Sequence, residues 1–333
     1  MYDLLKDWGI DKKVFSITLD NASANDCMQQ FLKDQLKLHG NLVCDGEFFH
    51  IRCCAHILHL IVKEGLAVAS GALHKIRESV KYVKGSDGRM KNFWDCVQQV
   101  GSIDVGAGLR LDVATRWNST YLMLDSALKY RRAFSCFQLN DPHYKYCPSE
   151  EEWERAEKLW KFLEPFYDIT TLMSGSKYLT SNLYFTQVWR IESLLNENMM
   201  SEDFVIREMC TKMKQKFDKY WREYSVVLAL GAVLDPRMKF KFLRFCFNKL
   251  DPFTCEEKLA KIKRNLYKLF GEYNKSKGQQ SSSSSSGVEF PQYNQRTFGG
   301  SKHRGSLGLD AATLNVSSTI ALVSYCFIVF LFE

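Results

Sequence analysis

The sequence predicts a chain that begins as an α/β fold and continues as a mostly α-helical one. Two short apolar runs near the N-terminus end in polar turns, as buried strands do, and beyond about residue 70 the apolar spacing becomes helical. Hydrophobic residues make up 46% and aromatic residues 14% of the 333 residues, which is enough to build the cores of about two domains.

The α/β part repeats a strand, a turn and a helix. The run KVFSITL, residues 13–19, is short, apolar and β-branched, and a helix is expected to follow it from Ser23 to about His39. Ser23 precedes Asp26 by three residues, the spacing of a capping box at a helix start. The second repeat places a strand at Glu47 to Arg52 and a helix at His56 to Leu66.

The remainder is predicted to be helical, with breaks near Gly101 to Gly108 and Asn140 to Pro148. Pro165 is expected to kink or split its helix. The expected helices are Ala72 to Val83, Met90 to Val100, Ser119 to Phe137, Glu150 to Met173, Trp189 to Asn196, Ser201 to Tyr224, and Glu256 to Tyr273.

Charge and cysteine content narrow the class of protein. The 45 basic and 38 acidic side chains give a formal charge of +7, which suits a polyanionic partner without requiring one. Eleven cysteines without framework spacing, two of them adjacent at Cys53 and Cys54, indicate reduced thiols in the cytosol or nucleus. The N-terminus carries no secretory signal pattern, and a secreted disulfide protein is not expected.

The first candidate site is TLDNASAN, residues 18–25, in which Asp20 ends a buried strand and Asn21 follows it. Ribonuclease-H-like nucleases place acids at this position, and two Mg²⁺ ions need acids from separate segments to hold the reacting oxygens of a phosphoryl transfer. One aspartate cannot do so. Alternatively, Asp20 and Asn21 form an Asx-type turn into the helix.

The second candidate is HIRCCAHILHLIV, residues 50–62, which brings Cys53 and His56 to a junction of strand and helix, with Cys54 and His59 nearby. Structural zinc needs four tetrahedral ligands, usually two separated pairs, so these crowded residues favour another interpretation. In this second interpretation, Cys53 is a small buried hydrophobic residue and His56 is a hydrogen-bonded residue at a helix start.

The third candidate is DVATRWNSTYLML, residues 112–124. Arg116 could contact phosphate and Trp117 could stack on an unpaired base, while Asn118 and Ser119 are good N-cap residues for the next helix. Alternatively, the tryptophan fills the core and the arginine pairs with Asp112.

In order and spacing these three motifs resemble the hAT transposase superfamily, specifically the plant RICESLEEPER-like group with a BED zinc finger. The resemblance covers about residues 1–270 and includes LEPFYDIT at 163–170 and AVLDPRMKF at 232–240. It implies a partial ribonuclease-H-like core, residues 1–68, interrupted by a large α-helical insertion domain, residues 69–274. Mg²⁺ or Mn²⁺ is implied only for an active enzyme.

The resemblance also assigns roles to individual residues. Asp20 matches the second of three metal-binding acids, Cys53 and His56 match a Cys-x-x-His element beside the active site, and Trp117 matches a tryptophan that stacks on a base. The first acid, the third acid and the zinc finger find no match, so the chain is expected to be a fragment, truncated at both ends, that does not cut DNA unaided.

The C-terminal part is predicted to be a Ser- and Gly-rich linker, residues 275–312, followed by an uncharged apolar tail, residues 313–333. The tail is long enough to be a membrane anchor. Alternatively, it is an artefact of the gene model. Three functions remain open: a catalytically inactive DNA-binding protein of the nucleus, a subunit of an active transposase working with full-length chains, and a non-enzymatic interaction module or pseudogene product.

Overall fold

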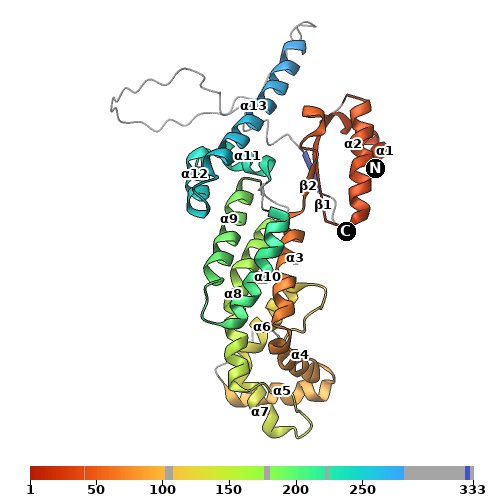
Figure 1. Ribbon diagram of the computed structural model, residues 1–333. Helices are drawn as coiled ribbons and strands as arrows, with labels where there is room; N and C mark the ends of the chain where they lie inside the picture. The colour runs from red at the N-terminus through yellow and green to blue at the C-terminus, as the bar shows by residue number, and fades with distance from the viewer. Residues whose placement is uncertain (41, 102–107, 176–180, 222–224, 281–326, 331–333) are drawn as a thin grey trace, which may run out of the picture.

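A computed structural model of the chain describes residues 1–40, 42–101, 108–175, 181–221, 225–280 and 327–330. The molecule is elongated, with a small sheet and its two covering helices at one end, beside a long assembly of helices (Figure 1). The α/β beginning and the mostly helical continuation predicted from the sequence are both present.

The sheet has three parallel strands among the described residues, in the order β2-β1-β3. The central strand β1, Val14–Leu19, pairs with β2, His50–Arg52, in a register that places Ile17 opposite His50 and Leu19 opposite Arg52. The helices α1, Tyr2–Asp7, and α2, Ser23–Leu38, cover one face, where Leu5, Ile17, Leu32 and Leu36 form a small separate core. Two 3-10 turns, η1 (Asp11–Lys13) and η2 (Val43–Gly46), connect these elements.

The third strand, β3, is Phe327–Phe330 and pairs in parallel with the other edge of β1. These four residues belong to the predicted apolar tail, whereas residues 313–326 and 331–333 of that tail lie outside the described part of the chain. No single described helix has the length and apolar character to cross a membrane, although α3 and most of α4, bent by 98° at their break, meet the criterion together.

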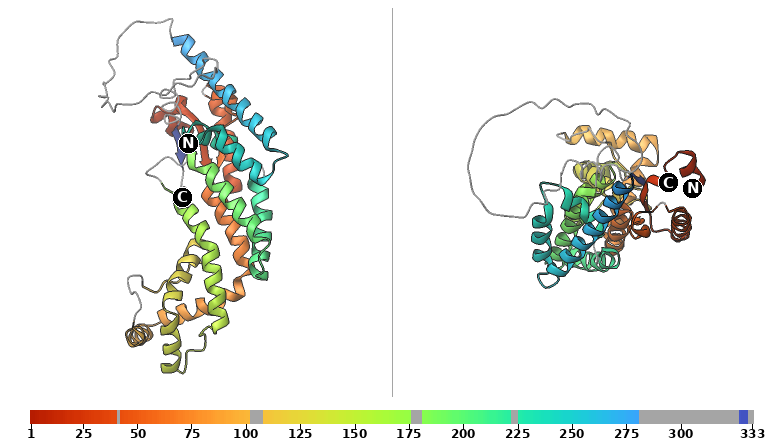
Figure 2. Two further views of the ribbon diagram at one scale, coloured as in Figure 1. Left: turned by 90° about the vertical axis from the view of Figure 1, so that its left-hand side faces the viewer. Right: turned by 90° about the horizontal axis from the view of Figure 1, so that it is seen from above.

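The helical assembly runs from α3 to α13, and α3, α8, α9 and α10 lie side by side along its length (Figure 2). Its helices are α3 Cys54–Val68, α4 Ser70–Lys84, α5 Asp87–Val100, α6 Trp117–Lys129, α7 Arg131–Asn140, α8 Glu150–Met173, α9 Ser181–Asn198, α10 Phe204–Trp221, α11 Val226–Leu234, α12 Lys239–Leu250 and α13 Cys255–Gln280.

Two hydrophobic cores hold these helices together. The larger extends from Ile51 at the end of β2 through α3 to α10 and includes Trp153, Phe93 and Phe134 at its centre. The smaller joins α9 to α11, α12 and α13 around Phe185 and Phe247. Because α3 packs inside the larger core, the change from the sheet core to the helical core falls at the end of β2, whereas the sequence places the domain boundary at residue 68.

The structure corrects several predicted helix boundaries. The single helix expected over 119–137 is two helices that meet at Tyr130. Pro165 does not split its helix, since α8 runs across it. The last helix extends to Gln280, into the first residues of the predicted linker, and α11 was not predicted at all. Most of the expected break at Gly101 to Gly108 lies outside the described residues.

Candidate functional site

The candidate site lies where β1 and β2 both end, at the carboxyl edge of the sheet. Parallel strands bring their carboxyl ends to one edge, which is where α/β folds place their ligands. Leu19 is opposite Arg52 in the register, and the backbone N–H of Cys53 donates to the carbonyl oxygen of Leu19 at 2.8 Å. Asp20 and Cys53 therefore follow neighbouring strand ends and lie close together.

Asp20 is partly exposed and accepts two hydrogen bonds on Oδ1. The backbone N–H of Ala22 donates at 2.8 Å and the side-chain Nδ2 of Asn25 at 2.6 Å. The bond from Ala22 lowers the pKa of Asp20; burial opposes this, and Asn25 and the charge of His56 lower it further. The carboxylate is thus held ionised, in an Asx-type turn that the sequence left as one alternative.

This turn also corrects the predicted start of the following helix. Ser23 is the first residue of α2, the N-cap is Ala22, and no side chain caps it. The expected capping box between Ser23 and Asp26 is therefore absent, and Asp20 bonds the turn that leads into α2 instead.

Replacing Asn25 by alanine removes the side-chain donor from Asp20, and the pKa of the Asp20 carboxyl is expected to rise toward its ordinary value. Carboxyl ¹³C chemical shifts, followed through a pH titration, measure the change. The control is Gln30→Ala, on the same helix, whose amide bonds Asp34 and which should leave the titration of Asp20 unchanged. An identical titration of Asp20 in Asn25→Ala would contradict the assigned hydrogen bond.

Asn21 and Arg52 join the two strand ends through their side chains. Arg52 donates from Nη1 to the Oδ1 of Asn21 at 3.0 Å, and its guanidinium carbon lies 5.9 Å from the centre of the Tyr220 ring in α10. The Nδ2 of Asn21 is buried without a partner among the described residues. Arg52 precedes the predicted cysteine and Tyr220 is far along the chain, so sequence reasoning missed both residues.

Cys53 and His56 lie at the start of α3, as predicted. Cys53 is the N-cap of this helix and partly buried, while Cys54 is fully enclosed and burial raises its pKa. The rings of His56 and His59 stack with their centres 6.0 Å apart, and burial, with help from His56 and Lys63, lowers the pKa of His59.

These residues do not form a metal centre within the described part of the chain. No group of three or more His, Cys, Asp or Glu side chains there could hold a metal ion. The ten described cysteines are all free thiols. Asp20, Asn21 and His56 therefore supply at most part of a ligand set, and no chemical step is assigned to a metal in this chain.

Arg116 and Trp117 lie at the start of α6, beside the middle of the helical assembly and away from the sheet edge (Figure 1). The Trp117 side chain is 4% exposed and belongs to the larger core, so its ring offers no free face to a base in this conformation. The N-cap of α6 is Arg116, whereas Asn118 and Ser119, the predicted caps, lie within the helix.

The predicted pairing of Arg116 with Asp112 is wrong, because another arginine holds that carboxylate. Arg77 of α4 donates from Nε and Nη2 to Asp112, the closest approach being 2.7 Å, and the Thr120 hydroxyl donates at 3.0 Å. The Arg116 side chain is exposed. A contact between Arg116 and phosphate therefore stays a prediction.

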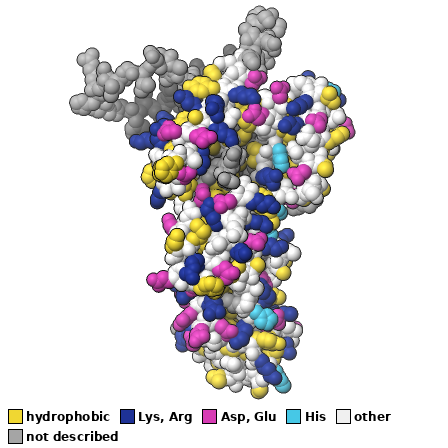
Figure 3. Space-filling model, viewed as in Figure 1, with side chains coloured by type: hydrophobic (Ala, Val, Ile, Leu, Met, Phe, Trp, Pro, Cys, Tyr) yellow, Lys and Arg dark blue, Asp and Glu magenta, His cyan; other side chains and the backbone are white. Residues whose placement is uncertain are grey.

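Basic residues gather around the junction of the sheet unit and the helices and over α12 and α13 (Figure 3). In the basic stretch 212–222 of α10 and the residue after it, Lys214 pairs with Glu192 and Asp218, and Lys216 pairs with Glu64. In the stretch 239–244, Arg244 pairs with Glu256. Carboxylates thus pair with three basic residues of these two stretches, which leaves fewer cations to meet a polyanion.

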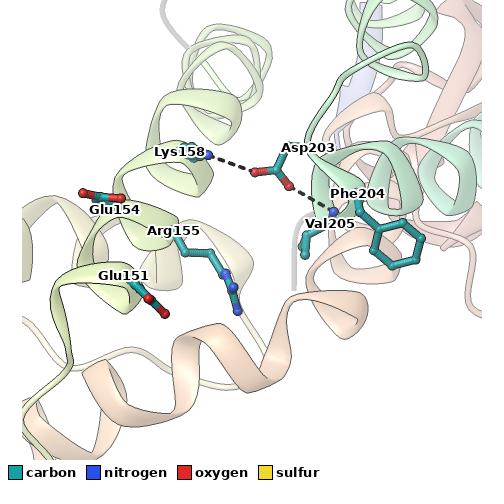
Figure 4. A pocket seen from close by; sticks show the side chains of 7 residues that line it. All are labelled: Glu151, Glu154, Arg155, Lys158, Asp203, Phe204 and Val205. Carbon is teal, nitrogen blue, oxygen red and sulfur yellow. Dashed lines mark hydrogen bonds and ion pairs between the residues drawn. The ribbon is translucent and has the colours of Figure 1, made fainter.

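A separate pocket of about 450 Å³ opens between the start of α8 and the start of α10 (Figure 4). Lys158 and Asp203 bridge it at 3.3 Å, and Asp203 also accepts from the backbone N–H of Val205 at 3.0 Å. Both acidic and basic side chains line the pocket. The pocket lies at the opposite end of α10 from Tyr220, roughly 25 Å away for a helix of this length. It is therefore not part of the sheet-edge site.

Family models match the chain in three consecutive segments. Residues 1–48 match the ZBED1 RNase-like domain, residues 51–162 the ZBED1 RNase-like helical domain, and residues 182–273 the hAT-like transposase RNase-H fold. The second match begins just before α3 and so agrees with the change of core observed at the end of β2. No solved structure matches the chain.

Several curated proteins are similar along most of the chain. Putative AC transposase of Zea mays is 40% identical over 269 residues, which are 79% of this chain and 33% of that protein. Zinc finger BED domain-containing protein RICESLEEPER 2 of Oryza sativa subsp. japonica is 36% identical over 270 residues, 81% of this chain and 37% of that protein. DAYSLEEPER of Arabidopsis thaliana is 30% identical over 269 residues, 81% of this chain and 38% of that protein. The chain thus spans about a third of the length of these relatives.

Proposed function

The chain belongs to the hAT transposase superfamily, and from this premise we propose that it binds DNA across the carboxyl edge of its sheet without cutting it unaided. The observation that carries the proposal is the convergence of Asp20, Asn21, Arg52 and His56 at this edge, from the ends of two strands and the start of α3. The Arg52 guanidinium and the ring nitrogens of His56 can bind a phosphodiester backbone. The ionised Asp20 carboxylate can share a metal ion that is supplied with further ligands.

Ligand chemistry supports the part of the proposal that the chain does not cut DNA unaided. Two-metal hydrolysis needs several acids to converge, and Asp20 lies without such a cluster in the described part of the chain. The proposed architecture is a ribonuclease-H-like core that is interrupted by an insertion, the helical region from α3 onward. The proposed cellular compartment is the nucleus. The remaining ligands would come from another polypeptide in the alternative function.

That alternative is a subunit of an active transposase, and the similarity to Putative AC transposase of Zea mays favours it. In this function Asp20 binds Mg²⁺ or Mn²⁺ together with acids from a complementing chain. Cleavage of DNA that requires the complementing chain and the metal, and that Asp20→Ala abolishes, would establish the alternative in place of simple binding.

The test is a titration of a fluorescein-labelled 30-base-pair DNA duplex with the purified chain, read as anisotropy between about 50 and 200 mM salt. We expect a dissociation constant on the order of 10⁻⁴ to 10⁻⁶ M near physiological salt, and log affinity falling linearly with log salt. The same mixtures with Mg²⁺ or Mn²⁺ should leave the duplex intact. A folded chain with no detectable binding at the lowest salt would overturn the proposal and favour an interaction module.

A further inference from the structure

Two cations flank one aromatic ring immediately beside the Asp20 edge. The guanidinium carbon of Arg52 lies 5.9 Å and the Nζ of Lys219 lies 5.5 Å from the centre of the Tyr220 ring. Arg52 is the last residue of β2 and bonds Asn21, whereas Lys219 and Tyr220 are at the end of α10. We call these three residues the Tyr220 cluster.

The close packing of α3 against α10 fixes the position of the Tyr220 cluster. Gly65 of α3 faces Met213 so closely that a Cβ at this glycine would lie 2.5 Å from the methionine Sδ. One turn further on, Lys216 of α10 pairs with Glu64 of α3 at 3.2 Å. Since α3 begins directly after Arg52 and Cys53, this contact holds the end of α10 at a set position relative to the sheet edge.

The two cations of the cluster differ from their neighbours in having no carboxylate partner among the described residues. On the same helix, Lys214 and Lys216 form ion pairs with Glu192, Asp218 and Glu64. Among the described residues Arg52 has one hydrogen bond, to the neutral amide of Asn21, so four of its five N–H donors remain available. Lys219 is exposed and contacts the ring. Among the described residues the cluster therefore presents two cations without a carboxylate partner, and Arg52 ties it to Asn21, the residue after Asp20.

Such an arrangement is complementary to a phosphate group. A guanidinium laid on an aromatic ring keeps its planar fork oriented, and this fork matches phosphate oxygens in a bidentate manner, while a lysine ammonium adds a point charge. The two cations would also offset the repulsion that a bound phosphate meets from the Asp20 carboxylate.

We propose that Arg52, Lys219 and Tyr220 clamp one phosphodiester group of a DNA strand and so lead that strand past Asp20. The clamp rests on the proposed DNA binding and adds to it the position and direction of the bound backbone. From the basic stretch 212–222 it uses Lys219, which has no carboxylate partner among the described residues, and not Lys214 or Lys216, which do.

The experiment compares Arg52→Gln and Lys219→Gln with the unaltered chain in the anisotropy titration with the 30-base-pair duplex. Each substitution is expected to weaken binding roughly tenfold at low salt, as for loss of a charged hydrogen bond. Each should also reduce the slope of log affinity against log salt, by at most about 0.9, the value for one phosphate contact, because both cations bind the same phosphate. Arg52→Lys should retain the slope but bind more weakly, because it keeps the charge and loses the planar fork.

The matched control is Lys91→Gln on α5, an exposed lysine at the far end of the molecule (Figure 1), which changes the net charge equally and should leave affinity and slope nearly unchanged. If all three glutamine variants behave alike, or if Arg52→Gln and Lys219→Gln keep the slope of the unaltered chain, the clamp is wrong while DNA binding stands. If the unaltered chain binds no duplex, the proposed function fails and the clamp with it. Should Arg52→Gln lose its fold by circular dichroism, Lys219→Gln on the helix surface decides the matter.

Discussion

Replacing Gly231 by alanine is expected to lower the free energy of unfolding by about 2 kcal/mol. Gly231 lies in α11, and a Cβ there would be 2.6 Å from the backbone carbonyl carbon and oxygen of Ser181 at the start of α9. No rotamer change relieves a clash with backbone, so α9 and α11 must separate, at a cost of about 3 kcal/mol. The higher helix propensity of alanine returns about 1 kcal/mol of this.

Urea unfolding followed by circular dichroism measures the effect, with Gly271→Ala as the matched control. Gly271 is also inside a helix, α13, but nothing lies within 4 Å of where its Cβ would be. The control should therefore stabilise the chain by up to about 1 kcal/mol through propensity alone. Equal responses of the two variants would show that α9 and α11 do not pack as closely as described.

The close approach at Gly231 also explains why α11 escaped prediction. Its sequence, VVLALGAVL, is apolar all round and short, so periodicity cannot distinguish it from a buried strand. Tertiary contacts decide its conformation. Asp235, just after α11, accepts from the Arg237 guanidinium and from Asn182, which holds the following turn against α9.

Local sequence patterns were sufficient to predict those helices and strands whose conformation is determined by their own residues. The strand Val14–Leu19 and the following helix were predicted because a β-branched run and a helical apolar stripe leave little choice. At Pro165 the local rule failed. Proline removes a backbone hydrogen bond, yet α8 continues because Leu163, Phe166 and Ile169 are buried on either side and their packing outweighs the loss.

The candidate site was predictable only in part, for a related reason. Asp20, Cys53 and His56 follow strand ends that neighbour each other in a parallel sheet, so their proximity could be inferred from order along the chain. Arg52 and Tyr220 meet only because α3 packs on α10, which no local pattern encodes. Trp117 shows the converse, since a motif typical of nucleic-acid contact is enclosed by the core.

The largest electrostatic effect is expected at Asp112, where alanine should lower the free energy of unfolding by about 3 kcal/mol. The Asp112 side chain is 2% exposed and the Arg77 side chain 33%, so removing the carboxylate leaves a partly buried guanidinium unpaired. The usual cost for a fully buried pair is 3–5 kcal/mol, and the lower end applies because Arg77 reaches water. In the double variant Arg77→Met, Asp112→Ala, part of the loss should be recovered, because no unpaired charge remains.

The difference in free energy of unfolding between the unaltered chain and Asp112→Ala should depend on pH if the ion pair causes it. Burial raises the pKa of Asp112, but the hydrogen bonds and charge of Arg77, with Thr120, outweigh it and hold the pKa below the ordinary value of 3.8. A carboxyl with a depressed pKa stabilises the fold above its unfolded pKa, and that contribution disappears as the pH falls through the folded pKa. The difference in free energy of unfolding between the two chains should therefore be constant from neutral pH to about pH 5 and should become smaller below about pH 4. A difference that does not change with pH in urea titrations would mean that Asp112 acts through packing, and that the loop carrying Arg116 is not held to α4 by charge.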